Sequence, residues 1–320
     1  MPLKPLVTIA IPTYNRAGRY LRKALESALQ QTYVQTEVLV VDNASTDHTP
    51  DLVRSYEEAY PQLRYIRRPE NKGPTDNFEH CLDLAEGEFF LMLHDDDCLD
   101  TDFLTTCLKA IDYDTDIGYV RTGVRSIDAR GNLVQEYPNE AGDLQHEAYI
   151  NAWLQYKIFW YFSSSLLNTE LFRSLGGFVT EIEQLVDIDA FVRFAFESQG
   201  VNVRPIKASF REHDERITGN ANVAEWVGEL QKIKELIVDR SSPEWKPTLA
   251  SHADEFSGWL SCHWADDIPH RLRRLYVYIL IARAFGLRSI PRPLSKVVRC
   301  IAPSSLERYL EQKVHSWRST

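Results

Sequence analysis

Apolar runs and amphipathic stretches alternate along the first hundred residues. Three short apolar runs have the length and composition of buried strands: residues 6–11, 37–41 and 89–93. We also expect a short strand at residues 64–67. Three stretches between them place apolar residues at helical spacing: 19–30, 45–60 and 75–86. We expect Ser45 to cap the second of these helices and Gly87 to end the third. The alternation predicts an α/β fold, with a mostly parallel sheet flanked by helices on both faces.

The pattern changes after about residue 100. A hairpin is predicted from residues 119–124 and 132–135, around the turn at 128–131. Two further strands and one helix are expected farther on, at residues 163–167, 201–210 and 186–199. Helical spacing dominates from about residue 222, so we expect a boundary between a region 1–221 and a helical region 222–320.

Polar clusters follow each of the first four predicted strands. The clusters are Thr13–Arg16, Asp42–Ser45, residues 71–73 and Asp95–Asp97. Because ligands of open parallel sheets bind along the carboxyl ends of the strands, we expect these four clusters to form one site.

The run Asp95-Asp96-Asp97 is the clearest chemical signal. Such a run is in general often a solvated acidic turn. Here it follows an apolar strand at the ligand edge, with no Lys or Arg beside it in sequence. Bound Mg²⁺ or Mn²⁺, which takes oxygen ligands and bridges carboxylate to phosphate, explains this pattern better. Asp42 keeps two interpretations, as a helix cap or as a contact to a nucleobase or ribose.

Charge is distributed unevenly around a net value of −10. Residues 268–320 hold 11 basic and 2 acidic residues, whereas residues 1–267 hold 25 basic and 44 acidic ones. The basic, amphipathic tail is expected either to bind an anionic membrane surface or to form a helical cap. Such a cap would pack on the rest of the protein or on a second copy of the chain in a homodimer. The acidic remainder argues against nucleic acid as a partner.

We also expect a cytoplasmic protein, and our hypothesis for the basic tail is peripheral attachment to the cytoplasmic face of the membrane. The apolar stretch 275–287 is too short to span a membrane and contains Arg283. We find no signal peptide at the N-terminus, and the five cysteines show no metal-ligand spacing.

The ordered set of motifs resembles family 2 glycosyltransferases, which have the GT-A fold, a Rossmann-type α/β arrangement. The matching pieces are the segment 7–16, the segment 40–47, the triplet 71–73, His94–Asp97, Gly176-Gly177-Phe178 and the segment 186–189. They occur in family order over about residues 5 to 215. The resemblance implies a catalytic domain at 1–221, with a nucleotide-sugar half at about 1–100 and an acceptor half at about 101–221.

The resemblance also implies roles for individual residues. Pro12, Thr13 and Asn15 would line the nucleoside pocket, Asp42 would contact the base, and Asp95 would contact the ribose or the metal. Asp96 would ligate the metal, with Asp97 close by. Asp187 would be the general base, although Val186 replaces the family's usual Glu and Asp189 is a second candidate. His213, in the segment Arg211-Glu212-His213, would reach the metal or the pyrophosphate; a surface histidine is the alternative.

The implied activity is inverting transfer of a sugar from a nucleotide diphosphate sugar to a saccharide or lipid-linked saccharide acceptor, in bacterial cell-surface polysaccharide or glycolipid assembly. A sugar nucleotidyltransferase and a non-catalytic binding module of the same fold are the alternatives; the first would release pyrophosphate. Six aromatic residues between Trp153 and Phe162 are expected to be mostly core, with one or two free to stack on an acceptor sugar.

Overall fold

The computed structural model describes residues 4–178, 181–213 and 223–266, and within the tail 277–278, 280–281 and 284–285. The chain divides into two compact units, residues 1–216 and 217–320. The expected boundary at residue 222 adjoins a segment, 214–222, outside the described residues, and it stays a prediction.

The first unit is built on one nine-stranded mixed sheet, with the strand order β3-β2-β1-β4-β8-β6-β9-β5 and β7 paired to β6. The strands are β1 (Val7–Thr13), β2 (Thr36–Asp42), β3 (Leu63–Arg67), β4 (Phe89–Met92), β5 (Cys98–Leu99), β6 (Tyr119–Ile127), β7 (Leu133–Tyr137), β8 (Ser165–Asn168) and β9 (Gly200–Arg211). The first four strands pair in parallel, whereas β8 runs antiparallel to both β4 and β6. The α/β prediction is confirmed, and so is the hairpin, since β6 and β7 pair antiparallel.

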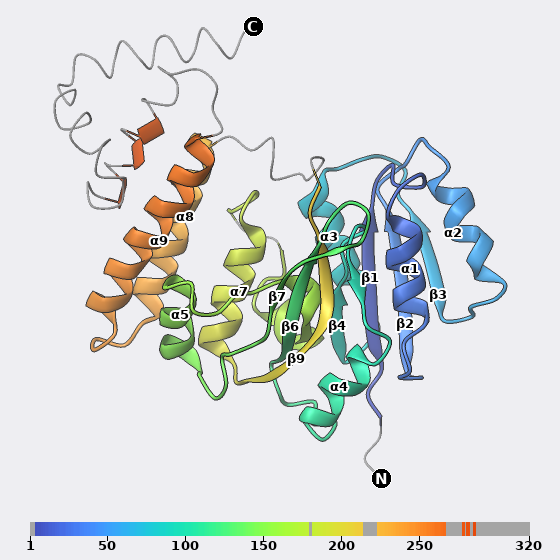
Figure 1. Ribbon diagram of the computed structural model, residues 1–320, viewed down its shortest axis with the longest axis horizontal. Helices are drawn as coiled ribbons and strands as arrows, with labels where there is room; N and C mark the ends of the chain where they lie inside the picture. The colour runs from blue at the N-terminus through green and yellow to red at the C-terminus, as the bar shows by residue number, and fades with distance from the viewer. Residues whose placement is uncertain are drawn as a thin grey trace, which may run out of the picture. The chain divides into compact units, whose positions relative to one another are not determined.

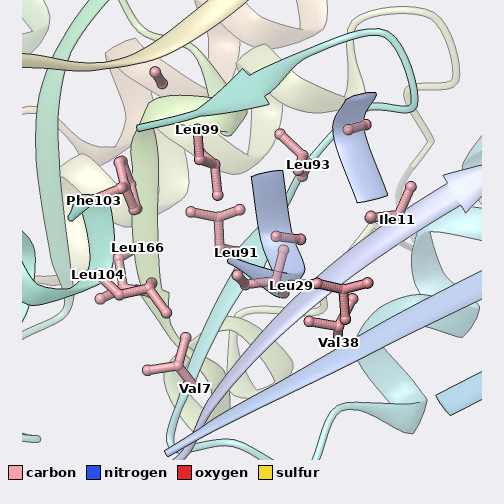
Figure 2. Packing of buried hydrophobic residues seen from close by; sticks show 14 of the residues in the cluster. Val7, Ile11, Leu29, Val38, Leu91, Leu93, Leu99, Phe103, Leu104 and Leu166 are labelled. Carbon is pink, nitrogen blue, oxygen red and sulfur yellow. The ribbon is translucent and has the colours of Figure 1, made fainter. Parts of the chain in front are cut away.

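Helices cover both faces of this sheet (Figure 1). They are α1 (Leu21–Leu29), α2 (Thr49–Glu57), α3 (Pro74–Leu84), α4 (Phe103–Ala110), α5 (His146–Leu154), α6 (Thr169–Ser174) and α7 (Val186–Glu197), with a 3-10 turn η1 (Phe162–Ser164). The core on one face joins apolar side chains of α1, α2 and α4 to those of the central strands. Figure 2 shows this packing, with Leu29 of α1 beside Val38 of β2. Strand β1 is buried at every residue, because it lies in the middle of the parallel group and is covered on both sides.

Two predicted helix ends were wrong. The second helix begins at Thr49, not at Ser45, because Ser45 Oγ accepts a hydrogen bond from the Asn15 backbone instead of capping. The third helix ends at Leu84, before Gly87. Gly87 is needed for a different reason: a Cβ there would lie 2.5 Å from the Thr8 backbone nitrogen, so only glycine allows this approach to β1.

The second unit contains α8 (Val223–Arg240) and α9 (Lys246–Asp266), which pack against each other. Lys234 Nζ of α8 donates to Asp254 Oδ1 of α9 at 2.6 Å. Most of the basic tail predicted to bind a membrane or to pack on protein lies outside the described residues. Within the described part of the chain, no helix is long and apolar enough to cross a membrane.

Candidate active site

The polar clusters after the first strands meet at one edge of the sheet. Register pairs Thr13 of β1 with Asp42 of β2, and Asp42 with Arg67 of β3, so these three strands end level with one another. Leu93, just past β4, still bonds to Ala10 of β1, which brings the acidic run to the same edge. The convergence expected from the sequence is therefore present.

Asn15 ties the loop after β1 to the loop after β2. Its backbone has a positive φ of 55°, and its side-chain Oδ1 accepts from the Thr46 backbone N–H at 2.7 Å. The Asn15 backbone N–H in turn donates to Ser45 Oγ at 2.8 Å. An asparagine suits this position because it tolerates a left-handed backbone and bonds nearby amides. Its direct contact with a nucleoside stays a prediction.

Asp42 lies fully buried at the end of β2, with protein donors at both carboxylate oxygens. Oδ1 accepts from the Ser45 backbone N–H at 2.8 Å, and Oδ2 accepts from the Tyr65 hydroxyl at 2.6 Å. Arg67 Nε lies 3.6 Å from Oδ2. The carboxylate thus shapes the loop after β2, and its contact with a base stays a prediction. Pro12, which pairs with Val41 in the sheet, is buried as well.

Asn43 performs a similar bracing role that the sequence did not single out. Its side-chain nitrogen donates to Asn71 Oδ1 at 2.8 Å and to the Gly73 carbonyl at 2.9 Å. Its oxygen accepts from the Lys72 backbone N–H at 3.1 Å. The third polar cluster is therefore held against the second by a single buried amide.

The three aspartates of the acidic turn have different surroundings. Asp95 Oδ2 accepts from the Thr13 hydroxyl at 2.8 Å, and Asp95 Oδ1 lies 3.6 Å from Arg16 Nε. Burial, and then the charge of Asp96, raises the pKa of Asp95 to about 7. Burial first, and repulsion from Asp96 second, thus favour protonation of Asp95 near neutral pH.

Asp96 and Asp97 are approached from the end of β9. Asp96 Oδ2 lies 2.9 Å from His213 Nε2, and the His213 side chain is only 4% exposed. Asp97 is buried and accepts from the Arg211 backbone N–H at 3.0 Å, with His94 Nδ1 3.6 Å from its other oxygen. The His213 side chain is therefore buried at the acidic turn and is not a solvated surface histidine.

Arg211 also belongs to the site, although the sequence assigned a role only to its neighbour His213. Its guanidinium donates to the Asp96 carbonyl and to the Asp128 carbonyl at 3.0 and 3.1 Å, and it lies over the ring of Tyr20. No Lys or Arg flanks the acidic run in sequence, yet Arg16 and Arg211 approach it in space. The Arg-x-His spacing at the end of β9 was the signal for this arrangement.

Asp187 begins helix α7 within electrostatic reach of the acidic turn. Burial works against protonation of His94, but the adjacent Asp97 carboxylate outweighs it and raises the pKa of His94 to about 9. The charge of Asp187 acts on His94 in the same direction. Asp187 itself is exposed, and its Oδ1 accepts from the Ile188 backbone N–H at 2.8 Å.

Asp189 has a different environment, although it lies only two residues farther along α7. It is buried, and its Oδ2 binds Arg193 Nε and Nη2 at 2.9 and 2.8 Å. Arg193 also donates to the carbonyls of Leu175 and Gly177 at 2.5 and 2.6 Å. The Asp189–Arg193 pair therefore fastens α7 to the Gly176-Gly177 turn and leaves Asp187 as the accessible carboxylate.

Glu79 of α3 holds the same turn from the other side. Its Oε2 accepts from the Phe178 backbone N–H at 2.6 Å, and burial raises the pKa of Glu79. Gly177 has a φ of 57°, and a Cβ there would lie 2.5 Å from Glu79 Oε2. The double glycine thus permits a turn that a side chain would obstruct.

The donor atoms of the acidic turn suit a hard divalent cation. A carboxylate oxygen of Asp96 and the imidazole nitrogen of His213 converge. The pKa of Asp95 is raised mainly by burial and further by the charge of Asp96, and a dication would favour the ionised form of both carboxylates. Among the described residues no three His, Cys, Asp or Glu side chains form a complete metal-binding group. Mg²⁺ sites commonly use one or two carboxylates and complete the shell with water and substrate phosphate.

Known proteins share this sequence pattern and this fold. The family model described as glycosyl transferase family 2 matches residues 8–175. Chondroitin synthase of Escherichia coli is 35% identical over 130 residues, which are 41% of this chain and 19% of that protein. A β-1,3-glucosyltransferase of Campylobacter jejuni, named for its GalNAc(5)-diNAcBac-PP-undecaprenol substrate, is 29% identical over 174 residues, 52% of this chain and 55% of that protein.

Solved structures give the same fold. Residues 1–349 of TarS from S. aureus, in complex with UDP-GlcNAc, superpose with a TM-score of 0.68 at 16% identity, covering 97% of this chain and 92% of that one. The mannosyltransferase PcManGT from Pyrobaculum calidifontis, in complex with GDP-Man and Mn²⁺, gives 0.53 at 20% identity, covering 97% and 83%.

The extent of the match differs between the sequence relatives and the family model. Alignment with the chondroitin synthase takes in about a fifth of that protein's length. The family model, by contrast, matches more than half of this chain, from β1 to the turn before α7. The chain belongs to glycosyl transferase family 2.

Proposed function

We propose that this protein transfers a sugar from a nucleotide diphosphate sugar to an acceptor hydroxyl, with inversion and with Mg²⁺ or Mn²⁺. The observation that carries the proposal is the arrangement of two carboxylate groups: Asp96 facing His213 after β4, and Asp187 at the start of α7 within electrostatic reach of the same turn. The first group would hold the donor diphosphate through the cation, and the second would serve the acceptor.

The donor side would be formed by the edge of the parallel strands. Asp96 and His213 are the residues that would hold the cation, with Asp95 and Asp97 beside them. When bound, Mg²⁺ or Mn²⁺ would supply positive charge at the leaving diphosphate. Thr13 and the braced loops after β1 and β2 would receive the nucleoside. The P. calidifontis neighbour, which binds GDP-Man together with Mn²⁺, supports this assignment.

Asp187 would act as the general base. It is exposed at the first turn of α7, so an acceptor hydroxyl can reach it, whereas Asp189 is buried against Arg193. A carboxylate that removes the hydroxyl proton during attack raises the rate by about 10²–10⁴. Attack from the side opposite the leaving diphosphate, in a single displacement, would invert the anomeric centre.

The acceptor would be a saccharide or a lipid-linked saccharide in bacterial surface polysaccharide or glycolipid assembly. The names of the E. coli and C. jejuni relatives support both acceptor classes. We further propose that the basic tail, residues 268–320, attaches the protein to the cytoplasmic face of an anionic membrane. Co-sedimentation with phosphatidylglycerol vesicles but not with neutral vesicles is the expected result, and equal pelleting with both would contradict it.

The activity is tested by the product released and by one substitution. The protein is incubated with Mn²⁺ and each of a panel of UDP-, GDP- and dTDP-sugars, and nucleoside diphosphate and pyrophosphate are measured separately. Release of nucleoside diphosphate supports glycosyl transfer, whereas release of pyrophosphate supports the nucleotidyltransferase alternative. Asp187→Asn should abolish turnover and leave nucleotide affinity unchanged; wild-type turnover in this variant would remove Asp187 from the mechanism.

A further inference from the structure

A cavity of about 200 Å³ lies on the second half of the sheet, away from the nucleotide edge. Three segments line it: the middle of β6, residues 136–140 at the end of β7, and the loop 157–159. Its side chains include two aromatic rings, from Tyr137 and Phe159, and the polar groups of Glu136 and Lys157. A concave site with aromatic walls and a few polar groups is the usual form of a small-molecule site.

Phe159, in the aromatic segment 153–162, is partly exposed and is not buried in the core. Trp153 and Phe162 are 7% and 4% exposed, whereas Phe159 is 39% exposed. Its ring contacts Tyr137 edge-on, with the ring centroids 5.3 Å apart. Tyr137 stacks in turn on Phe210, which directly precedes Arg211. An apolar wall therefore runs from the cavity toward the acidic turn.

Two buried polar side chains, Arg121 and Asn139, line the cavity and are held by hydrogen bonds. Arg121, only 2% exposed, donates to the Phe159 carbonyl and lies 4.7 Å over the ring of Trp160. Asn139 donates to the Arg121 carbonyl and to Asn202 Oδ1 at 3.1 and 3.2 Å. These contacts fix the loop that presents Phe159, while Glu136 and Lys157 are exposed at the rim. Fixed walls lower the entropy that is lost when a ligand is ordered.

Strand register gives the position of this cavity relative to the candidate active site. Val124 pairs with Tyr137 on one side and with Ala208 on the other, whereas Ile127 pairs with Arg211. Three residues of strand separate the two positions, which is about 10 Å. In the sheet order, β6, which lines the cavity, lies between the strands assigned to the nucleotide and β9. Strand β9 in turn lies between β6 and β5, which directly follows the acidic turn, and the Arg211 backbone N–H on β9 binds Asp97.

We propose that this cavity is a subsite for a pyranose unit of the acceptor, with the ring of Phe159 against the sugar's C–H face. Glu136 would accept hydrogen bonds from its hydroxyls, and Lys157 would donate to them. The role of this cavity as an acceptor subsite rests on the proposed function, whereas the binding of a pyranoside does not.

The test is saturation-transfer difference NMR on the full chain, without nucleotide or metal. The probes are a panel of methyl pyranosides and methyl disaccharides with neutral, N-acetylated and uronate sugars. At least one probe should receive saturation from the wild type. Phe159→Ala should lower that signal at least fivefold, and Glu136→Ala should lower it by a smaller factor.

Tyr156→Ala is the matched control. Tyr156 lies in the same segment with 36% exposure, close to the 39% of Phe159, but it does not line the cavity. It should leave the probe signals unchanged, and circular dichroism should show both variants folded.

The outcomes separate the subsite from the proposed function. No probe signal with the wild type, or an equal signal in Phe159→Ala, would overturn the subsite. Nucleoside diphosphate release by the wild type would still uphold the proposed function in that case. Conversely, Phe159-dependent binding without any donor turnover would uphold a pyranoside site and overturn its role in transfer.

Discussion

The loops after β1 and β2 and the acidic turn after β4 lie at the same sheet edge but handle their polar groups in opposite ways. In the loops, the side chains of Asn15 and Asp42 accept hydrogen bonds from backbone N–H groups of the loop after β2. The Asn43 side chain donates to Asn71 in the loop after β3, so these polar groups have partners within the protein. In the acidic turn, carboxylates crowd together and burial raises the pKa of Asp95 to about 7. The hydrogen-bonded loops shape a site, whereas three adjacent carboxylates supply the oxygen ligands that a divalent cation prefers.

The largest expected effect follows from neutralising the acidic turn. Asp96→Asn should lower turnover by about 10²–10³, because charge stabilisation of the leaving group is of this size. The melting temperature without ligand should change little, since the substitution relieves repulsion with Asp95 and the amide oxygen can still accept a hydrogen bond from His213 Nε2. Excess EDTA should reproduce the loss in the wild type.

The matched control for this prediction is Asp51→Asn, which removes the same charge from an exposed carboxylate on α2. It should leave turnover unchanged. Full activity of the Asp96 variant, or of the wild type in EDTA, would show that the crowded carboxylates do not serve a cation.

Asp189→Asn tests whether the buried Asp189–Arg193 pair stabilises the fold, as the buried hydrogen bonds of the loops after β1 and β2 are expected to do. Removing one partner of the buried Asp189–Arg193 pair should lower the free energy of unfolding by about 3–5 kcal/mol. Urea denaturation measures this loss. Asp187→Asn, two residues away and exposed, should change it by less than about 0.5 kcal/mol. Equal stability of the two variants would contradict the separation of roles.

Asp42→Asn tests the brace directly. If the amide oxygen keeps the Ser45 N–H, the amide nitrogen replaces the oxygen that accepts from Tyr65 and lies 3.6 Å from Arg67 Nε. A donor that loses its acceptor in a buried site costs about 1–3 kcal/mol. Thermal unfolding should therefore show a lower melting temperature. Tyr65→Phe, which removes one donor and keeps the carboxylate, should have the smaller effect. A stable Asp42→Asn variant that has lost only nucleotide affinity would instead favour a direct contact with the base.

The smallest effect concerns Glu79 and pH. Burial raises the folded-state pKa of Glu79 above its ordinary value of 4.5, so the folded state binds the proton more tightly. Stability from this group is greatest below the unfolded pKa and is lost as pH rises through the folded pKa. Glu79→Gln keeps the acceptor for Phe178 N–H and should lose less stability between about pH 4 and 8. Glu58→Gln, exposed at the end of α2, should follow the wild type.

Local patterns predicted the first half of the site well because its parts are contiguous in sequence. Thr13, Asp42 and Asp95 lie at or just past the ends of their strands, so parallel pairing alone brings them to one edge. Helix starts were harder to predict. Ser45 has the chemistry of a cap, but Asn15 from another loop competes for its hydroxyl, and the helix begins four residues later.

The sequence by itself determined the alternating elements, the sheet edge and the order of the motifs, because hydrophobic periodicity and strand ends are local properties. Only the tertiary structure decided which polar groups act on each other. It brought Arg211 and His213 across more than a hundred residues to the acidic turn, buried Asp189 against Arg193 while exposing Asp187, and distinguished Phe159 from its buried aromatic neighbours. These outcomes depend on how β9, α7 and β6 pack, since burial and charge neighbours are properties of the assembled fold.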